Sequence, residues 1–190
     1  MAAILQDVPG RRLTAPYSKD NQLNGIIAGL TDLAGGQNLH ASGHVKVILS
    51  TSLDTPGHAR EHLIKVDNST IAATKDLANS WIGYDFGPSV RIVPISYTLK
   101  ARPDYDPGHK SAPHSYIIET SEDGVTWMAI DWQTDVTDIK NNSAVVHFEV
   151  KRVPSPSRYI RICQTQKNGH GTNHLVLAAF EIFGACYSIE

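Results

Sequence analysis

Alternation of apolar and polar side chains, the pattern of half-buried β-strands, recurs along most of the chain. It is clear over residues 93–99, 146–151, 158–162 and 180–184, between clusters of Gly, Pro, Asn and Asp. In the first of these segments the odd-numbered residues are the apolar ones, so we expect them to face the core, and Pro94 indicates an edge strand or a bulge. Period two repeated between turn residues predicts an antiparallel β-sandwich.

Helical spacing is confined to two short stretches. Apolar residues from Leu23 to Leu33 recur every three or four positions, and Gly35-Gly36 follows as a C-terminal stop. Residues 59–66 predict a second short helix or helical turn. Because the start of the chain has no periodicity, we expect an irregular N-terminal lead-in over residues 1–22, followed by one domain over residues 23–187.

Composition agrees with a single domain of about 150 residues or more, which can bury a sizeable core. The formal net charge is −2 and the 17 Lys and Arg residues are scattered, which argues against nucleic acid as a ligand. The N-terminus lacks the features of a signal peptide, and no apolar run approaches the ~20 residues of a membrane span. We therefore predict a cytoplasmic protein in which Cys163 and Cys186 are free thiols.

Four segments follow one another in an order that resembles a known family. They are Val45–Ser52, Trp81–Gly87, the Tyr116–Trp127 strand with its Ser-Glu-Asp-Gly turn, and the pair of strands between residues 158 and 184. Together they cover roughly residues 40 to 185 and resemble the discoidin, or coagulation factor V/VIII type C, galactose-binding-like domains. The lead-in from Gly25 to Gly36 is similar to intracellular modules of this family associated with BTB proteins and ubiquitin ligases.

The resemblance implies an all-β, jelly-roll β-sandwich with one or two short helices, and a non-catalytic domain that binds ligands on loops at one end. It also implies that Trp81 and Trp127 lie in or near the core, where Trp127→Ala would cost ~3 to 5 kcal/mol. Extracellular relatives bind membranes through exposed apolar loop tips. The loops at 54–58 and 100–113 offer no Phe, Leu or Trp tip, so we expect no membrane partner.

One candidate ligand-binding loop spans residues 100 to 110. An Arg fork, a carboxylate and an aromatic face can hold a sugar or a peptide acid. Arg102-Pro-Asp104 echoes the Arg-x-Asp of fucose-binding lectins of this superfamily, although their other basic residues have no counterpart at matching spacing. The alternative is a solvated loop. The predicted ligand-binding residues here are Arg102, Asp104, Tyr105, His109 and Lys110.

The second candidate loop spans residues 165 to 174 and joins the last two strands. It resembles the Asn-Gly-x-x-Thr-His loop of the DOC domain, the degron-reading subunit of the anaphase-promoting complex, although Asn173 intervenes before the final histidine. Gly- and Asn-rich loops present N–H groups to peptides, but they also make tight connections. The predicted ligand-binding residues here are Lys167, Asn168, His170 and His174, and we expect both loops to form one surface.

Histidine pairs raise the alternative of a metal site. Three pairs have the i, i+4 spacing that places two imidazoles on one helix face: His40/His44, His58/His62 and His170/His174. Only the second lies in a helical segment, and there Arg60 would repel a cation and no third ligand is indicated. The chain also lacks a Gly-x-Ser-x-Gly nucleophile elbow and a Gly-rich phosphate loop. We expect no metal, no cofactor and no enzymatic activity.

The sequence thus favours a non-catalytic recognition module for a protein or peptide partner. A carbohydrate-binding, lectin-like domain with a glycan as its partner is the alternative from a different class. A metal-dependent hydrolase comes third.

Overall fold

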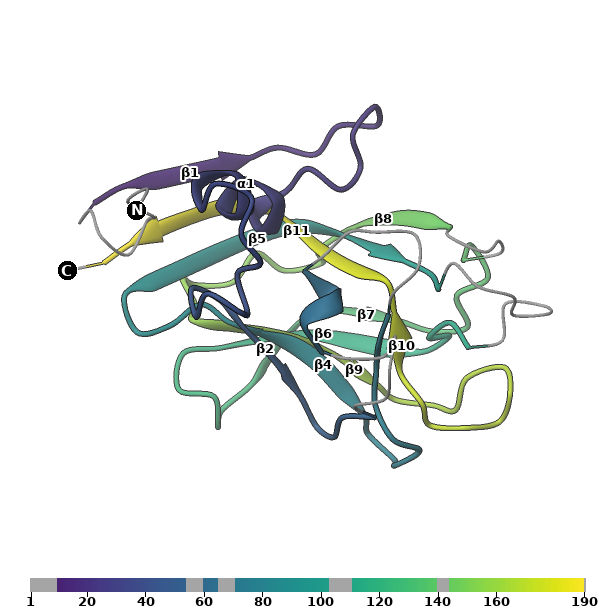
Figure 1. The fold of residues 1–190 in the computed structure, drawn as a ribbon. Coiled ribbons are helices and arrows are strands. Elements are labelled where there is room, and N and C mark those ends of the chain that lie inside the picture. The colour runs from purple at the N-terminus through teal and green to yellow at the C-terminus, as the bar shows by residue number, and fades with distance from the viewer. Residues whose placement is uncertain (1–9, 54–59, 65–70, 103–110, 140–143, 190) are drawn as a thin grey trace.

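Two antiparallel sheets pack face to face in the computed structural model, which describes residues 10–53, 60–64, 71–102, 111–139 and 144–189 (Figure 1). The prediction of an all-β, jelly-roll sandwich is confirmed. The first sheet has the order β1-β11-β5-β8. Its strands are β1 (Arg12–Ala15), β11 (Ala179–Ser188), β5 (Val90–Lys100) and β8 (Val145–Glu149).

The second sheet has five strands in the order β2-β4-β9-β6-β7. They are β2 (Lys46–Leu49), β4 (Trp81–Asp85), β9 (Tyr159–Gln164), β6 (Tyr116–Ser121) and β7 (Met128–Gln133). A two-stranded ribbon pairs β3 (Ala72–Ala73) with β10 (Val176–Leu177). The helical segments are α1 (Ile26–Leu33) and a 3-10 turn, η2 (Arg60–Leu63). Each predicted helical stretch therefore contains a helical segment, although residues 23–25 and Ile64 are described and are not helical.

Residues 12–15 differ from the predicted irregular lead-in. They form β1, which pairs antiparallel with β11 from Arg12↔Tyr187 to Ala15↔Gly184. A four-residue edge strand is too short to show a period of its own, and it is ordered by the backbone donors and acceptors that the longer strand offers. The pairing therefore brings the first described residues against the last strand.

The core lies between the sheets and is rich in aromatic side chains. Tyr84, Tyr97, Tyr116 and Phe180 are fully buried. The Tyr84 hydroxyl donates a hydrogen bond of 2.7 Å to the carbonyl oxygen of Phe180, and burial raises the pKa of Tyr84 well above its usual value. Each sheet contributes rings to this core, because Tyr84 and Tyr116 lie in the second sheet and the other two in the first.

The resemblance implies that Trp81 and Trp127 lie in or near this core, and that prediction is wrong. Both are only half-buried and lie on the outer face of the second sheet. The Arg161 guanidinium stacks on them, 3.8 Å from the ring centre of Trp127 and 5.3 Å from that of Trp81. Side chains on β4 alternate, so the inward positions belong to Ile82 and Tyr84, and Trp81 faces outward.

A buried carboxylate attaches α1 to the first sheet. Glu181 of β11 is 2% exposed and accepts hydrogen bonds from the N–H groups of Ile27 (2.9 Å) and Ala28 (3.1 Å) in the first turn of the helix. Burial raises the pKa of Glu181 to about 7, although these hydrogen bonds oppose the shift. A Cβ at Gly25 would lie 2.3 Å from the carbonyl oxygen of Ile182, so only glycine permits this close approach.

In the part of the chain that the structure describes, no helix has the length and apolar character needed to cross a membrane.

Candidate functional site

A small apolar platform lies at one end of the sandwich, where the ribbon β3–β10 meets the loop that follows β9. Ala73 pairs with Val176, and Ile71 and Ala178 complete a buried cluster against which Leu53 packs. This cluster is separate from the main core. It therefore offers an apolar floor close to the surface.

The loop over residues 165–174 is held in shape by the side chain of Asn168, which is 5% exposed. Its Oδ1 accepts hydrogen bonds from the N–H of His170 (3.1 Å) and from the N–H and hydroxyl of Thr172 (3.2 and 3.1 Å). Its Nδ2 donates to the carbonyl oxygen of His174 (3.1 Å). Gly171, with φ at +75°, supplies the left-handed turn that closes the loop. The amide of Asn168 thus organises the loop from within.

The same loop is tied to the segment before β4. The N–H and Nδ2 of Asn173 donate to Asp76 Oδ1 (2.6 and 2.9 Å), and the first of these bonds lowers the pKa of Asp76. His174 Nδ1 lies 2.8 Å from the carbonyl oxygen of Thr74, which can only accept, so Nδ1 carries the proton. In the neutral ring, Nε2 of His174 is then a hydrogen-bond acceptor.

Together these elements enclose a pocket of about 260 Å³. Its floor is aliphatic and its rim is polar, with Arg102 as the one Lys, Arg, Asp or Glu residue among the described residues that line it. Such a pocket can hold an apolar group while the rim supplies donors and acceptors to a polar group beside it. The lining residues are Leu53, Ile71, Ala73, Val176, Arg102, Ser111, Asn168, His170, Thr172 and His174.

Four of the predicted ligand-binding residues come together in this pocket: Arg102, Asn168, His170 and His174. Lys167 is exposed and does not line it. The remaining predicted residues, Asp104, Tyr105, His109 and Lys110, lie outside the described residues.

Sequence reasoning missed the aliphatic floor and two rim residues, Ser111 and Thr172. The short apolar runs at Ile71–Ala73 and Leu175–Ala178 were the available signal. A run of this kind indicates burial but does not identify its partner, which here lies about a hundred residues away. The floor therefore depends on a pairing that local pattern does not predict.

Among the histidines outside the pocket, His40 makes a local contact. His40 Nδ1 accepts a hydrogen bond of 3.1 Å from the N–H of Val47, and burial lowers the pKa of His40. His58 lies outside the described residues, so the structure does not describe the His58/His62 pair. Within the described ranges, no group of three or more His, Cys, Asp or Glu residues could hold a metal ion.

Cys163 and Cys186 are free and buried, and burial raises the pKa of both thiols, that of Cys186 to about 12.

Comparisons with known proteins agree with the fold. The E3 ubiquitin-protein ligase Ufd4 of Drosophila melanogaster is 29% identical over 147 residues, which cover 75% of this chain but 5% of the ligase. The solved structure of CpGH89CBM32-5 from Clostridium perfringens, in complex with GalNAc-β-1,3-galactose, has a TM-score of 0.58 at 14% identity over 75% of this chain and 96% of the other. A fucolectin from striped bass (Morone saxatilis) serum also has a TM-score of 0.58, at 15% identity over 74% of this chain and 47% of the lectin.

The family model of the F5/8 type C domain matches residues 47–178, which is more than half of the chain. The match begins in β2 and ends just after β10, so it covers the second sheet, β5 and β8 of the first sheet, and the ribbon under the pocket. The chain belongs to the F5/8 type C, or discoidin, family of binding domains.

Proposed function

We propose that this domain is a non-catalytic recognition module that binds a segment of a protein partner. The binding site is the pocket of about 260 Å³ between the ribbon β3–β10 and the loop after β9, which we call the loop pocket. The observation that carries the proposal is the aliphatic floor formed by Ile71, Ala73 and Val176 beneath a polar rim. An aliphatic side chain of a partner fits such a floor, and Arg102 and His174 can then bond to the peptide groups next to it.

Two further observations support a protein ligand. None of the described residues that line the loop pocket is Trp, Tyr or Phe. These are the side chains whose flat faces would pack against the ring of a sugar. The similarity to Ufd4, a ubiquitin ligase, associates this type of domain with a much larger protein that acts on other proteins. The lining also contains no carboxylate or cysteine among its described members, which supports binding rather than catalysis.

A carbohydrate ligand is the second candidate. It is favoured by the hydrogen-bonding rim of the loop pocket, since Ser111 and Thr172 carry hydroxyls and His174 has an acceptor nitrogen that suit sugar hydroxyls. The Clostridium module of the same fold was solved with a bound disaccharide. The two candidate functions thus place different ligands, a protein segment or a glycan, in the same loop pocket.

We propose the cytoplasm as the compartment. Buried, unpaired thiols at Cys163 and Cys186 fit a reducing environment, where disulfides are rare. A nucleic-acid ligand has no support in the net charge of −2.

Parallel screens separate the two candidates. The full chain is incubated with a displayed random-peptide library and with a glycan array, and the best ligand is measured by calorimetry. We expect enriched peptides to share an aliphatic residue and no glycan to bind. If the chain bound selected glycans and no peptide were enriched, the protein-binding proposal would be wrong and a lectin function would take its place.

Variants test the loop pocket itself. Arg102→Ala and His170→Ala are expected to weaken binding of the selected peptide by about fivefold or more, the effect of ~1 kcal/mol at a binding hot spot, with unchanged thermal unfolding. Arg12→Ala, an exposed arginine on β1, is the matched control and should bind like the wild type. Equal affinity for the wild type and both rim variants would show that the ligand binds elsewhere.

A further inference from the structure

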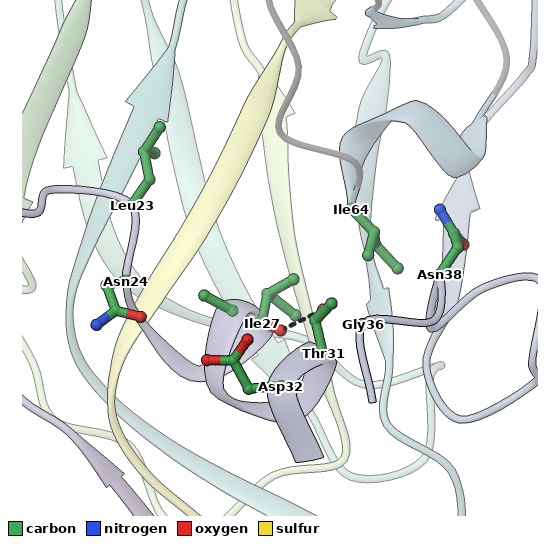
Figure 2. Close-up of a pocket in the computed structure, with 9 residues that line it drawn as sticks. Leu23, Asn24, Ile27, Thr31, Asp32, Gly36, Asn38 and Ile64 are labelled. Carbon is green, nitrogen blue, oxygen red and sulfur yellow. Dashed lines mark hydrogen bonds between the residues drawn. The ribbon is translucent and has the colours of Figure 1, made fainter. Parts of the chain in front are cut away.

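A second pocket lies against α1, among residues that do not contribute to the loop pocket (Figure 2). Its volume is about 440 Å³, within the range of ligand-binding cavities. Ile27 and Ile64 are buried and form its floor, and Ala28 and Leu23 extend the apolar surface. Figure 2 shows that the lining comes from the lead-in to α1, from the helix itself, from Gly36 and Asn38 in the segment after the helix, and from Ile64 just after η2. The pocket has the apolar floor of a built cavity.

The polar side chains around this pocket fall into two groups. Thr31 and Asn38 are committed to the protein: the Thr31 hydroxyl donates to the Ile27 carbonyl (2.8 Å) and Asn38 Nδ2 donates to the Glu61 carbonyl (3.1 Å). Asn24 and Asp32 are exposed at the rim. Asp32 is the one charged residue among the described residues of the lining.

The position of Asp32 in the helix concentrates negative charge at the pocket. It lies in the last turn of α1, where the carbonyl ends of the peptide dipoles already produce a partial negative charge, and that turn contains no basic residue. Helices favour cationic side chains at this end, so Asp32 breaks the usual rule. Positions that break a local rule without internal compensation are often functional. A cation supplied from outside would provide the missing compensation.

Ala28 and Asp32 are one helical turn apart and therefore lie on the same face of α1. An occupant thus meets apolar surface first and a carboxylate about one turn further along. An aliphatic chain that ends in an ammonium group matches this order. We propose that the α1 pocket binds a lysine side chain of a protein partner, with its methylene groups on the apolar floor and its ammonium group at Asp32.

The test uses two small probes and nuclear magnetic resonance on the full chain. The first probe is Nα-acetyl-lysine N-methylamide, and the second is the same compound acetylated on Nε, which keeps the alkyl chain and loses the charge. We expect saturable shifts of the backbone amides of Ala28, Thr31 and Asp32 with the charged probe. The acetylated probe should bind about three- to fivefold more weakly, as expected for one exposed charge interaction near a helix terminus.

Exposed-residue variants identify the carboxylate. Asp32→Asn should lower the affinity for the charged probe to that for the acetylated one, whereas Asp20→Asn, an exposed aspartate outside the lining, should change neither. Arg102→Ala should leave lysine binding unchanged, so failure of the loop pocket would not affect this result. Equal affinities for both probes, or no saturable shift at the α1 amides, would overturn the proposal.

Discussion

Arg161 packs against two tryptophan side chains that lie outside the core, on the outer face of the second sheet. Its guanidinium contacts the rings of both Trp81 and Trp127, and its Nε donates to Glu119 Oε2 at 2.8 Å. The resemblance identified both tryptophans but not the face on which they lie. The alternation of side chains along β4 explains the outward position of Trp81, because it directly precedes the inward Ile82. A motif match thus identifies a residue type, whereas the strand geometry decides which face its side chain occupies.

Trp127→Ala is accordingly expected to cost less than the loss of a core aromatic. The side chain is half-buried, so the free energy of unfolding should fall by about 1 to 2 kcal/mol, the scale of a partly desolvated cation–π contact. Urea denaturation of the wild type and the variant measures this. Val125→Ala, at a side chain that is 82% exposed, is the control and should change little. A loss of 3 kcal/mol or more would return Trp127 to the role of a core residue.

At the level of elements, β5 shows where periodicity is informative and where it ends. The inward positions predicted for Tyr97 and Leu99 are correct, but Ile95 is 43% exposed. The register against β11 shifts here, from Phe183↔Ser96 to Gly184↔Pro94, so one extra residue of β5 forms a bulge. Pro94 had indicated a bulge or an edge, and the strand is not at an edge. A period-two pattern does not reveal an inserted residue. At the bulge, the alternation of inward and outward side chains along β5 therefore shifts by one position.

The contact between α1 and β11 is also an interaction between elements, and it predicts a pH dependence. The folded protein holds the pKa of Glu181 at about 7, above its ordinary value of 4.5. Because the folded state binds the proton of Glu181 more tightly than the unfolded state, protonated Glu181 stabilises the fold. This stabilisation is complete below about pH 4.5 and is lost as the pH rises through 7. The loss amounts to at most about 3 kcal/mol, at about 1.4 kcal/mol per pH unit.

Glu181→Gln removes the titrating group and keeps its size. Stability is measured by urea denaturation between pH 4.5 and pH 7.5, and the stability advantage of the wild type over the variant should shrink across this range. Glu122→Gln alters an exposed glutamate paired with Arg91 and should show no such trend. A constant difference between wild type and Glu181→Gln would mean that the carboxylate ionises normally in the folded protein.

At the scale of the whole molecule, the two sheets are joined along one side by the segment after β8. The N–H of Val150 donates to the Ile95 carbonyl of the first sheet (3.0 Å), and the N–H of Arg152 donates to the Ile130 carbonyl of the second (2.9 Å). Lys151 between them places its Nζ 3.1 Å from Asp131 Oδ1. The sandwich could be predicted from the order of its strands. This polar junction could not, because it joins residues that are far apart in sequence and follow no pattern.

Asp131 is fully buried between the sheets, and its Oδ2 accepts hydrogen bonds from the Tyr97 hydroxyl (2.6 Å) and from Gln133 Nε2 (2.8 Å). Tyr97 belongs to the first sheet and Asp131 to the second, so this bond crosses the interior. Burial raises the pKa of Tyr97 far above its ordinary value, which keeps the hydroxyl protonated and able to donate. Like the hydrogen bond between Tyr84 and Phe180, this contact links the two sheets through the interior.

Tyr97→Phe removes this donor while keeping the ring. We expect the free energy of unfolding to fall by about 1.5 to 3 kcal/mol, the cost of losing a hydrogen bond to a buried charged group. Tyr187→Phe, at a half-buried tyrosine on β11, is the matched control and should have little effect. A double-mutant cycle with Asp131→Asn, measured by urea denaturation, should give a coupling energy of about 1 kcal/mol or more. Additive effects of the two substitutions would mean that Tyr97 and Asp131 stabilise their sheets independently, without a coupling across the interior.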